Sequence, residues 1–115
     1  MTEIDIREFI FGMPSRFSPE HAEGLSAKIQ FLIDGGGSFV LLIEDGNCVA
    51  EERIEETPTL QLKMSRKTYI DLAMGQLKGP QAFFTRKLRF RGDTKLLMKM
   101  HTIFPALKKE DIKRT

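Results

Sequence analysis

The stretch from Thr59 to Phe104 constrains the fold most strongly, because it places several elements in succession with almost no spare residues. Residues 60–64 carry apolar side chains at every second position, which is the period of a half-buried strand. Ser65 then stands where a helix N-cap belongs, and an apolar stripe at helical spacing follows it. Gly79 and Pro80 interrupt this stripe, so we expect the helix to end there.

The second half of this stretch predicts a short helical turn, a basic strand and a final helix. Pro80 suits the first helical position before residues 81–84. Residues 87–91 alternate Lys or Arg with Leu and Phe, so this strand has one basic and one apolar face. Asp93 then caps an amphipathic helix that extends to Phe104. The apolar faces of these elements must close on one another or on a bound molecule.

Five motifs follow one another here. They are Leu-x-Leu-x-Met-Ser at 60–65, Leu-Ala-Met-Gly-x-Leu at 72–77, Pro-Gln-Ala-Phe-Phe at 80–84, Lys-Leu-x-Phe-x-Gly-Asp at 87–93, and Leu-Met-Lys-Met at 97–100. In this order they resemble the sterol carrier protein type 2 domain, also called the sterol transfer domain. The resemblance covers nearly all of the chain from Met13 to Phe104. One departure is Arg86, which stands where that family commonly has Gly.

The resemblance implies an α+β fold with a five-stranded mixed, mainly antiparallel sheet that helices cover around an apolar tunnel. It also implies non-catalytic binding and transfer of a lipid, such as a sterol, fatty acid or acyl thioester. On this chain it assigns six apolar residues to the ligand's apolar body and one polar residue to the tunnel mouth. The six are Met74, Leu77, Phe83, Phe84, Met98 and Ile103, and the polar residue is Gln81.

The length of 115 residues suffices for one core, so we expect a single domain over residues 1–115. Within it we expect a helix at 1–15 that Pro14 ends, and a basic tail at 105–115. No apolar run reaches the roughly 20 residues of a membrane-spanning helix. Acidic residues also stand near the amino terminus, where a signal peptide would be basic. The expected location is therefore the cytoplasm.

Charge is distributed unevenly along the chain. Residues 1–85 contain 8 Lys or Arg and 13 Asp or Glu, a net charge of −5, whereas residues 86–115 contain 10 and 3, a net charge of +7. This basic quarter is either a solvated face or a surface for a phosphate-bearing partner. An anionic membrane surface fits lipid transfer. A nucleic acid is disfavoured, because no nucleic-acid-binding motif accompanies the charge.

The amino-terminal half predicts three further strands. Residues 25–33 alternate apolar and polar side chains, which puts Gln30 on the polar face. A triple-glycine turn then leads to a second strand at 38–44, and a strand rather than a helix after such a loop argues against a phosphate cradle. Residues 48–56 predict a polar edge strand whose glutamates face solvent.

The residue types needed for catalysis do not occur together. Cys48 is the single cysteine, His21 and His101 share no motif, and no serine lies in a nucleophile elbow. We therefore predict no catalytic residue, metal or cofactor, and an enzyme is the weaker hypothesis.

From periodicity alone, the Met and Phe side chains are core residues rather than the wall of a pocket. A filled core would favour another class of function, a protein-interaction or homodimerisation module. Lipid that copurifies with the protein would favour a carrier. A concentration-dependent dimer without lipid would favour the interaction module.

Overall fold

The computed structural model describes residues 5–105, so the first part of the expected helix at 1–15 and nearly all of the tail at 105–115 lie outside the described residues. The elements, in chain order, are α1 (Ile6–Arg16), η1 (Pro19–Ala22), β1 (Ala27–Asp34), β2 (Gly37–Glu44), β3 (Asn47–Glu51), β4 (Leu60–Ser65), α2 (Arg66–Ala73), α3 (Gly79–Phe84), β5 (Leu88–Gly92) and α4 (Thr94–Ile103). Among them, no helix is both long and apolar enough to cross a bilayer.

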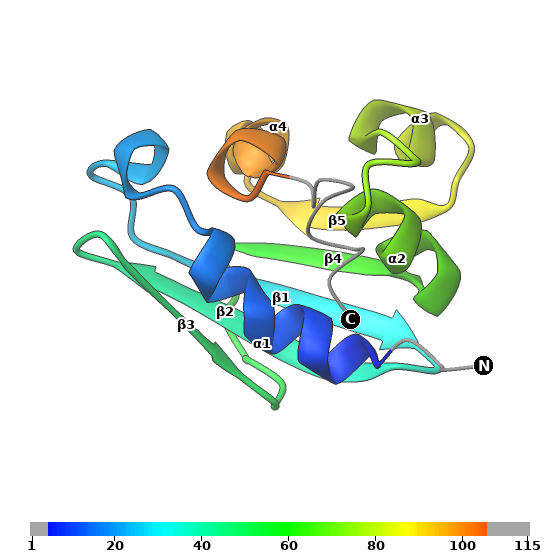
Figure 1. Cartoon of the computed structure of the whole chain (residues 1–115), viewed down its shortest axis with the longest axis horizontal. Coiled ribbons are helices and arrows are strands. Elements are labelled where there is room, and N and C mark those ends of the chain that lie inside the picture. The colour runs from blue at the N-terminus through cyan, green and yellow to red at the C-terminus, as the bar shows by residue number, and fades with distance from the viewer. Residues whose placement is uncertain (1–4, 106–115) are drawn as a thin grey trace.

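The strands form one mixed sheet in the order β3-β2-β1-β4-β5 (Figure 1). β1 is parallel to β4, and the other neighbouring pairs are antiparallel. Two-residue turns at Gly35-Gly36 and Asp45-Gly46 join β1 to β2 and β2 to β3, as their sequences predict. The expected five-stranded, mainly antiparallel sheet is confirmed.

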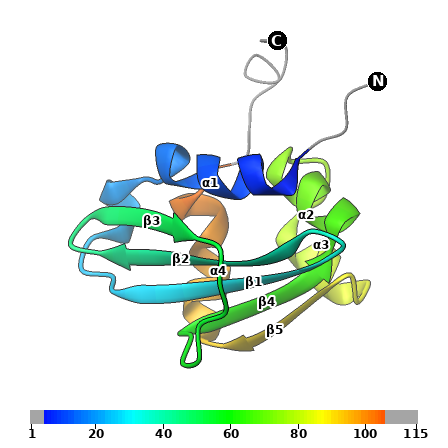
Figure 2. The same ribbon diagram turned by 90° about the horizontal axis from the view of Figure 1, so that it is seen from below.

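The helices lie on one face of this sheet (Figures 1 and 2). α1 packs over β2 and β3, α2 over β1 and β4, α3 over β5 and α4 over β4. The strands turn alternate side chains toward the helices, as the period of two predicts. Burying each large apolar side chain in this layer contributes about 1.5–3 kcal/mol. The most deeply buried of these strand residues are Ile29, Leu41, Leu60 and Phe39.

The connection from β3 to β4 crosses the opposite face of the sheet. β3 is an edge strand, and β4 lies beyond β2 and β1, so residues 52–59 must pass over both strands (Figure 2). Val40 and Gln30 lie opposite each other beneath this crossing segment, and both side chains are fully buried. The prediction of a strand over 48–56 is wrong beyond Glu51, because the chain leaves the sheet edge there.

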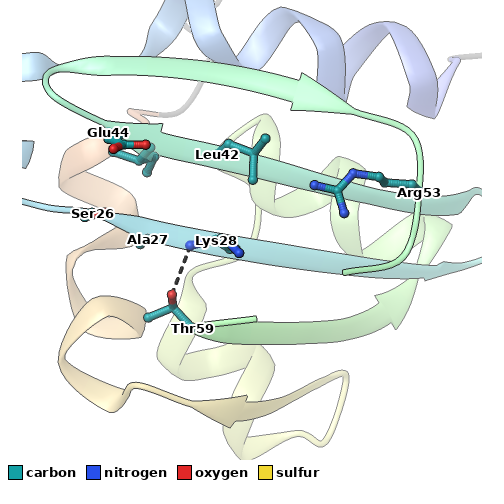
Figure 3. A pocket seen from close by; sticks show the side chains of 8 residues that line it. Ser26, Ala27, Lys28, Leu42, Glu44, Arg53 and Thr59 are labelled. Atoms are coloured by element: carbon teal, nitrogen blue, oxygen red, sulfur yellow. Dashed lines mark hydrogen bonds between the residues drawn. The ribbon is translucent and has the colours of Figure 1, made fainter. Parts of the chain in front are cut away.

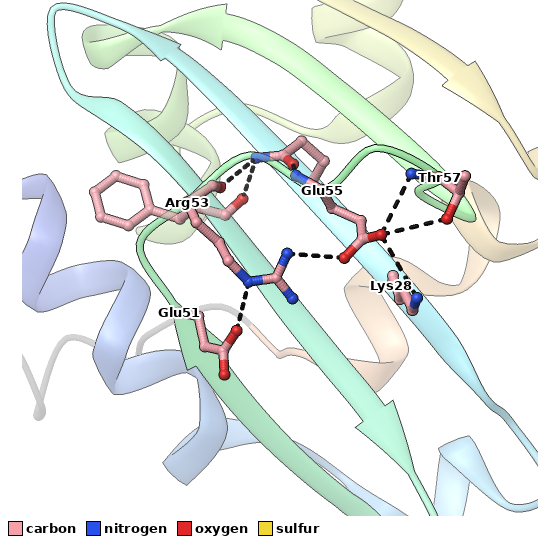
Figure 4. A network of polar contacts seen from close by, with 7 residues as sticks. Lys28, Glu51, Arg53, Glu55 and Thr57 are labelled. Atoms are coloured by element: carbon pink, nitrogen blue, oxygen red, sulfur yellow. Dashed lines mark hydrogen bonds and ion pairs between the residues drawn. The ribbon is translucent and has the colours of Figure 1, made fainter.

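Gln30 holds the crossing segment on the sheet. Its side-chain nitrogen donates to the backbone oxygens of Arg53 (3.1 Å) and Phe39 (2.8 Å), and its side-chain oxygen accepts the Glu55 N–H (Figure 4). A buried backbone group without a partner costs about 1–3 kcal/mol, so these bonds allow a polar segment to lie there. Gln30 lies on the face that the alternation predicts, and the crossing segment buries it there.

Two helix ends also differ from the sequence prediction. α1 runs through Pro14 to Arg16, because a proline in the last turn removes only one backbone donor. α2 ends at Ala73 rather than at Gly79 and Pro80. Gly75 adopts a positive φ of 75° there and lets the following N–H groups bond back to the carbonyl of Asp71.

Candidate functional site

The seven predicted ligand residues come from α3, from α4 and from the segment that follows α2. Ile103 is fully buried, and two further residues are half-buried, whereas four are exposed in this conformation. The half-buried pair is Met74 and Leu77, after α2. The exposed four are Gln81, Phe83 and Phe84 on α3 and Met98 on α4. The structure thus buries only part of this set, and Ile103 lies beside η1, where its carbonyl oxygen accepts the Ser18 N–H.

α3 packs on β5 and leaves two aromatic rings uncovered. The Phe83 ring lies 5.5 Å from the Phe90 ring of β5 and 5.8 Å from the Phe84 ring, measured between centroids. Phe83 is 45% exposed and Phe84 is 80% exposed. Fully burying a phenylalanine side chain is worth about 1.5–3 kcal/mol, so this end of the helical layer would gain from an apolar partner.

The turn from α3 into β5 passes through Arg86 in a left-handed conformation, with φ of 60°. The resemblance leads one to expect glycine here, and glycine adopts this conformation without a Cβ penalty. Backbone bonds from Arg86 N to Phe83 O and from Lys87 N to Ala82 O close the turn at 3.0 and 2.8 Å. The turn therefore forms with arginine at this position, and the left-handed backbone conformation of Arg86 costs about 1–2 kcal/mol in free energy.

The helical layer also contains two polar groups without hydrogen-bond partners. The Tyr69 hydroxyl of α2 and the Arg16 Nε at the end of α1 are both buried and make no hydrogen bond of ordinary geometry, although the Arg16 guanidinium lies close enough to Tyr69 to interact with it. The Tyr69 ring packs edge-on against Phe9 and Phe31, at 6.4 and 5.9 Å between centroids. Burial raises the pKa of Tyr69 to about 12, although the Arg16 guanidinium acts in the opposite direction.

The apolar stripe that the sequence predicts after Ser65 contains Tyr69, whereas no sequence pattern points to Arg16 as a functional residue. The sequence does contain a signal for a polar contact here, because Tyr69 is the single tyrosine of the chain and lies on the apolar stripe. A buried tyrosine hydroxyl usually has a hydrogen-bond partner. The position of Arg16 depends on α1 running past Pro14, which the sequence did not predict.

One pocket lies on the opposite face of the sheet, beside the crossing segment (Figure 3). It has a volume of about 280 Å³ and is lined in part by Lys28, Leu42, Arg53 and Thr59. The Lys28 N–H donates to Thr59 Oγ1 at 3.0 Å, which fixes the start of β4 against β1. None of the seven predicted ligand residues lines this pocket.

Acidic side chains neutralise the cations around this first pocket (Figure 4). Glu55 accepts from the Arg53 guanidinium at 2.9 Å and from Lys28 Nζ at 3.5 Å, and Glu51 pairs with Arg53 at 2.6 Å. The hydrogen bond from Arg53, followed by that from the Thr57 backbone, lowers the pKa of Glu55 to about 2. The prediction that these glutamates are simply solvated is wrong for Glu55, which anchors the crossing segment.

A second pocket, of about 170 Å³, lies on the same outer face between β4 and β5. Its lining contains three cationic side chains and no acidic one. The lining residues are Gln61, Lys63, Arg89, Phe90 and Arg91.

Within residues 5–105, no group of three or more His, Cys, Asp or Glu side chains is arranged to hold a metal ion. Cys48 is half-buried on β3, and burial raises the pKa of its thiol to about 11. The thiol is therefore protonated at neutral pH and is a poor nucleophile. His21 Nδ1 lies 2.7 Å from the neighbouring Ser18 hydroxyl, in a local contact within the η1 turn.

The sequence was compared with models of known protein families, and one of them matches it over most of its length. The sequence model of the SCP-2 sterol transfer family matches residues 13–105. The chain belongs to the SCP-2 sterol transfer family. Family membership supports lipid binding or transfer in general, and it confirms the resemblance carried by the five motifs. No protein with a curated description matches the sequence.

Solved structures share the SCP-2 fold at low sequence identity. Sterol carrier protein domain 2 of Helicoverpa armigera is 21% identical, with a TM-score of 0.67 over 83% of this chain and 79% of that one. Sterol carrier protein 2 of Aedes aegypti, solved with palmitate, is 16% identical, with a TM-score of 0.69 over 93% of this chain and 100% of that one.

A larger protein also contains the SCP-2 fold. A sec-alkylsulfatase from Pseudomonas sp. is 15% identical, with a TM-score of 0.74 over 84% of this chain. The present chain spans only 16% of the sulfatase's length. Identities this low establish the shared fold, and the activity of the larger enzyme does not carry over to this chain.

Proposed function

We propose that this chain holds an apolar ligand between the helical layer and strands β4 and β5, and carries it between membranes without covalent chemistry. The observation that carries the proposal is the pair of uncovered rings on α3, in a domain whose family is named for sterol transfer. α3 is a single short helix that packs mainly on β5. Displacing it requires few contacts to break, so we place the entrance of the site beneath α3.

The energetic benefit of such a carrier is the avoidance of water. Exposing an alkyl chain or sterol ring costs roughly 25 cal/mol per Å² of apolar surface. A ligand that passes from a bilayer into the protein interior does not bear that cost during transit. Met74, Leu77, Phe83 and Ile103 are proposed to contact its apolar body. Gln81, Phe84 and Met98 are proposed to form the rim, which agrees with their exposure.

The proposed ligand has one polar group as well as an apolar body. Arg16 Nε and the Tyr69 hydroxyl are unpaired within the layer, and an unpaired buried polar group costs about 1–3 kcal/mol. A hydroxyl or carboxylate on the ligand would satisfy them. Fatty acids, acyl thioesters and sterols are therefore better candidates than plain hydrocarbons.

The variant Tyr69→Phe tests this polar contact. It removes an unpaired hydroxyl, so the empty protein should gain about 1 kcal/mol in its free energy of unfolding. Affinity for a fatty acid should fall in the same variant. Urea denaturation and fluorescence titration measure the two quantities. A loss of more than about 1 kcal/mol in the empty protein would show that the hydroxyl is bonded after all.

The variant Phe83→Ser tests the apolar contact. We expect its affinity for a fluorescent fatty acid to fall about tenfold or more, because a phenylalanine contact is worth about 1.5–3 kcal/mol. Phe11→Ser is the matched control, since Phe11 is similarly exposed at 41% but lies on α1 at the other edge of the sheet. Equal affinities in the two variants would contradict the proposed location.

The same titration tests the interaction-module hypothesis. A protein that takes up no fatty acid or sterol, but forms a concentration-dependent dimer, would assign the exposed rings of α3 to a protein interface.

A further inference from the structure

The second outer pocket carries positive charge without compensation. Lys63 on β4 lies directly opposite Arg89 on β5, and Gln61 lies directly opposite Arg91. Side chains directly opposite on one face of an antiparallel pair have Cβ atoms about 4.5–5.5 Å apart, and like charges in that position destabilise the sheet. The three cations therefore repel one another across the β4–β5 ladder.

No ion pair relieves this repulsion within the part of the chain that the structure describes. The ion pairs there include those of Arg7, Lys28, Arg53 and Lys67, and none involves the three cations of the second pocket. The first outer pocket on the same face shows the contrast, because Glu51 and Glu55 neutralise its cations. The cations of the second pocket would therefore be stabilised by an anion from outside the chain. Two guanidinium groups with fixed donors match the oxygens of a phosphate best.

The other side of the same sheet edge is apolar and aromatic. β5 is the edge strand, and α3 packs on its helix-facing side, where Phe84 is 80% exposed (Figure 1). Arg86 and Lys87 lie in the turn between α3 and β5, and both are exposed. A single edge thus presents three cations on one side and an uncovered ring on the other. A bilayer surface offers both partners, phosphates at its outside and acyl chains below them.

We propose that the β5 edge docks on a bilayer that contains anionic phospholipid, with Lys63, Arg89 and Arg91 against lipid phosphates and Phe84 at the acyl boundary. This inference rests on the proposed carrier function, because docking by this edge turns the α3 entrance toward the membrane. It adds a membrane-facing orientation and a lipid class to that function. The phosphate site lies on the face of the sheet opposite the ligand.

The test compares two double variants in vesicle flotation. Arg89→Gln/Arg91→Gln removes two charges from the second pocket. Arg7→Gln/Lys67→Gln removes two charges from exposed positions on α1 and α2, so the net charge is equal. On vesicles of phosphatidylcholine with phosphatidylglycerol, the first variant should bind about 30-fold more weakly than wild type, from about 1 kcal/mol per surface charge. The control should stay close to wild type, and binding should weaken with added salt.

Several outcomes would overturn the proposal. Equal binding by the two double variants would show that net charge alone attracts the protein. Equal wild-type binding to vesicles of phosphatidylcholine alone, which have no net charge, would show that anionic phospholipid is not required. Perturbation of Lys63, Arg89 and Arg91 resonances by inorganic phosphate, without vesicle binding, would assign the pocket to a free anion. Uptake of fatty acid from solution without vesicles is measured in parallel. If the protein does not bind vesicles but still takes up fatty acid, the proposed docking by the β5 edge is wrong and the proposed carrier function is retained.

Discussion

Gln30→Leu is expected to lower the free energy of unfolding by about 3 kcal/mol. Leucine has a similar size, but it leaves the Arg53 carbonyl and the Glu55 N–H without the partners that Gln30 provides beneath the crossing segment. Each unpaired buried group costs about 1–3 kcal/mol. A domain of this length is stable by only about 5–15 kcal/mol, so the loss is a large share. Denaturant unfolding monitored by circular dichroism measures it.

Gln61→Leu is the matched control for this variant. Gln61 is the neighbour of Gln30 across the β1–β4 pair, and it is half-buried on the same face. The part of the chain described by the structure shows no hydrogen bond from its side chain. Its substitution should change stability by no more than about 0.5 kcal/mol. Similar losses in both variants would mean that the crossing segment is not held by Gln30.

Gly92→Ala is expected to lower the free energy of unfolding by about 3 kcal/mol or more. A Cβ at this position would overlap the Thr59 carbonyl oxygen, and the φ of 114° is one that side-chain-bearing residues rarely adopt. The Thr59 oxygen also accepts the Asp93 N–H at 3.0 Å, so moving it disturbs the start of α4. Thermal and denaturant unfolding measure the effect.

Gly24→Ala separates the two causes. Gly24 has a positive φ of 75°, but a Cβ there would meet no atom within 4 Å. Its substitution should therefore cost only about 1–2 kcal/mol, from backbone conformation alone. If Gly92→Ala is no worse than this control, the close approach between β4 and β5 is not as tight as the structure shows.

Much of the fold was predictable because its signals are local. The alternation of apolar and polar residues predicts β1, β2, β4 and β5. Ser65 and Asp93 cap α2 and α4 as expected, because their side chains accept backbone N–H groups of the first turn. Such caps and periods depend only on neighbouring residues. The sequence therefore predicts them without knowledge of what each element packs against.

The crossing segment was not predictable in the same way. Gln30 occupies a polar position in the alternation of its strand, so the sequence predicts it on the outer face. It is buried there only because residues 52–59 cross the sheet above it. The same path brings Glu55 to Arg53 and Lys28. No local pattern reports a contact between segments more than 20 residues apart. The early end of α2 had a local signal in Gly75, but Gly79 and Pro80 were the stronger sequence breakers.

The candidate site was predicted as a group of residues rather than as a geometry. Periodicity places Ile103 on the buried side of α4, and the structure agrees. It cannot say that α3 will pack mainly on β5 and leave Phe84 outside. The exposure of a short helix depends on which neighbours it meets, and the main neighbour of α3 is β5.

The measurement that tests the carrier account most directly is native mass spectrometry of freshly purified protein, followed by solvent extraction and identification of the released molecule. The account predicts a bound lipid in defined stoichiometry, with an apolar body and one hydroxyl, carboxylate or thioester group. An empty protein that also takes up neither fluorescent fatty acid nor sterol would contradict it. The uncovered rings of α3 would then belong to a protein interface.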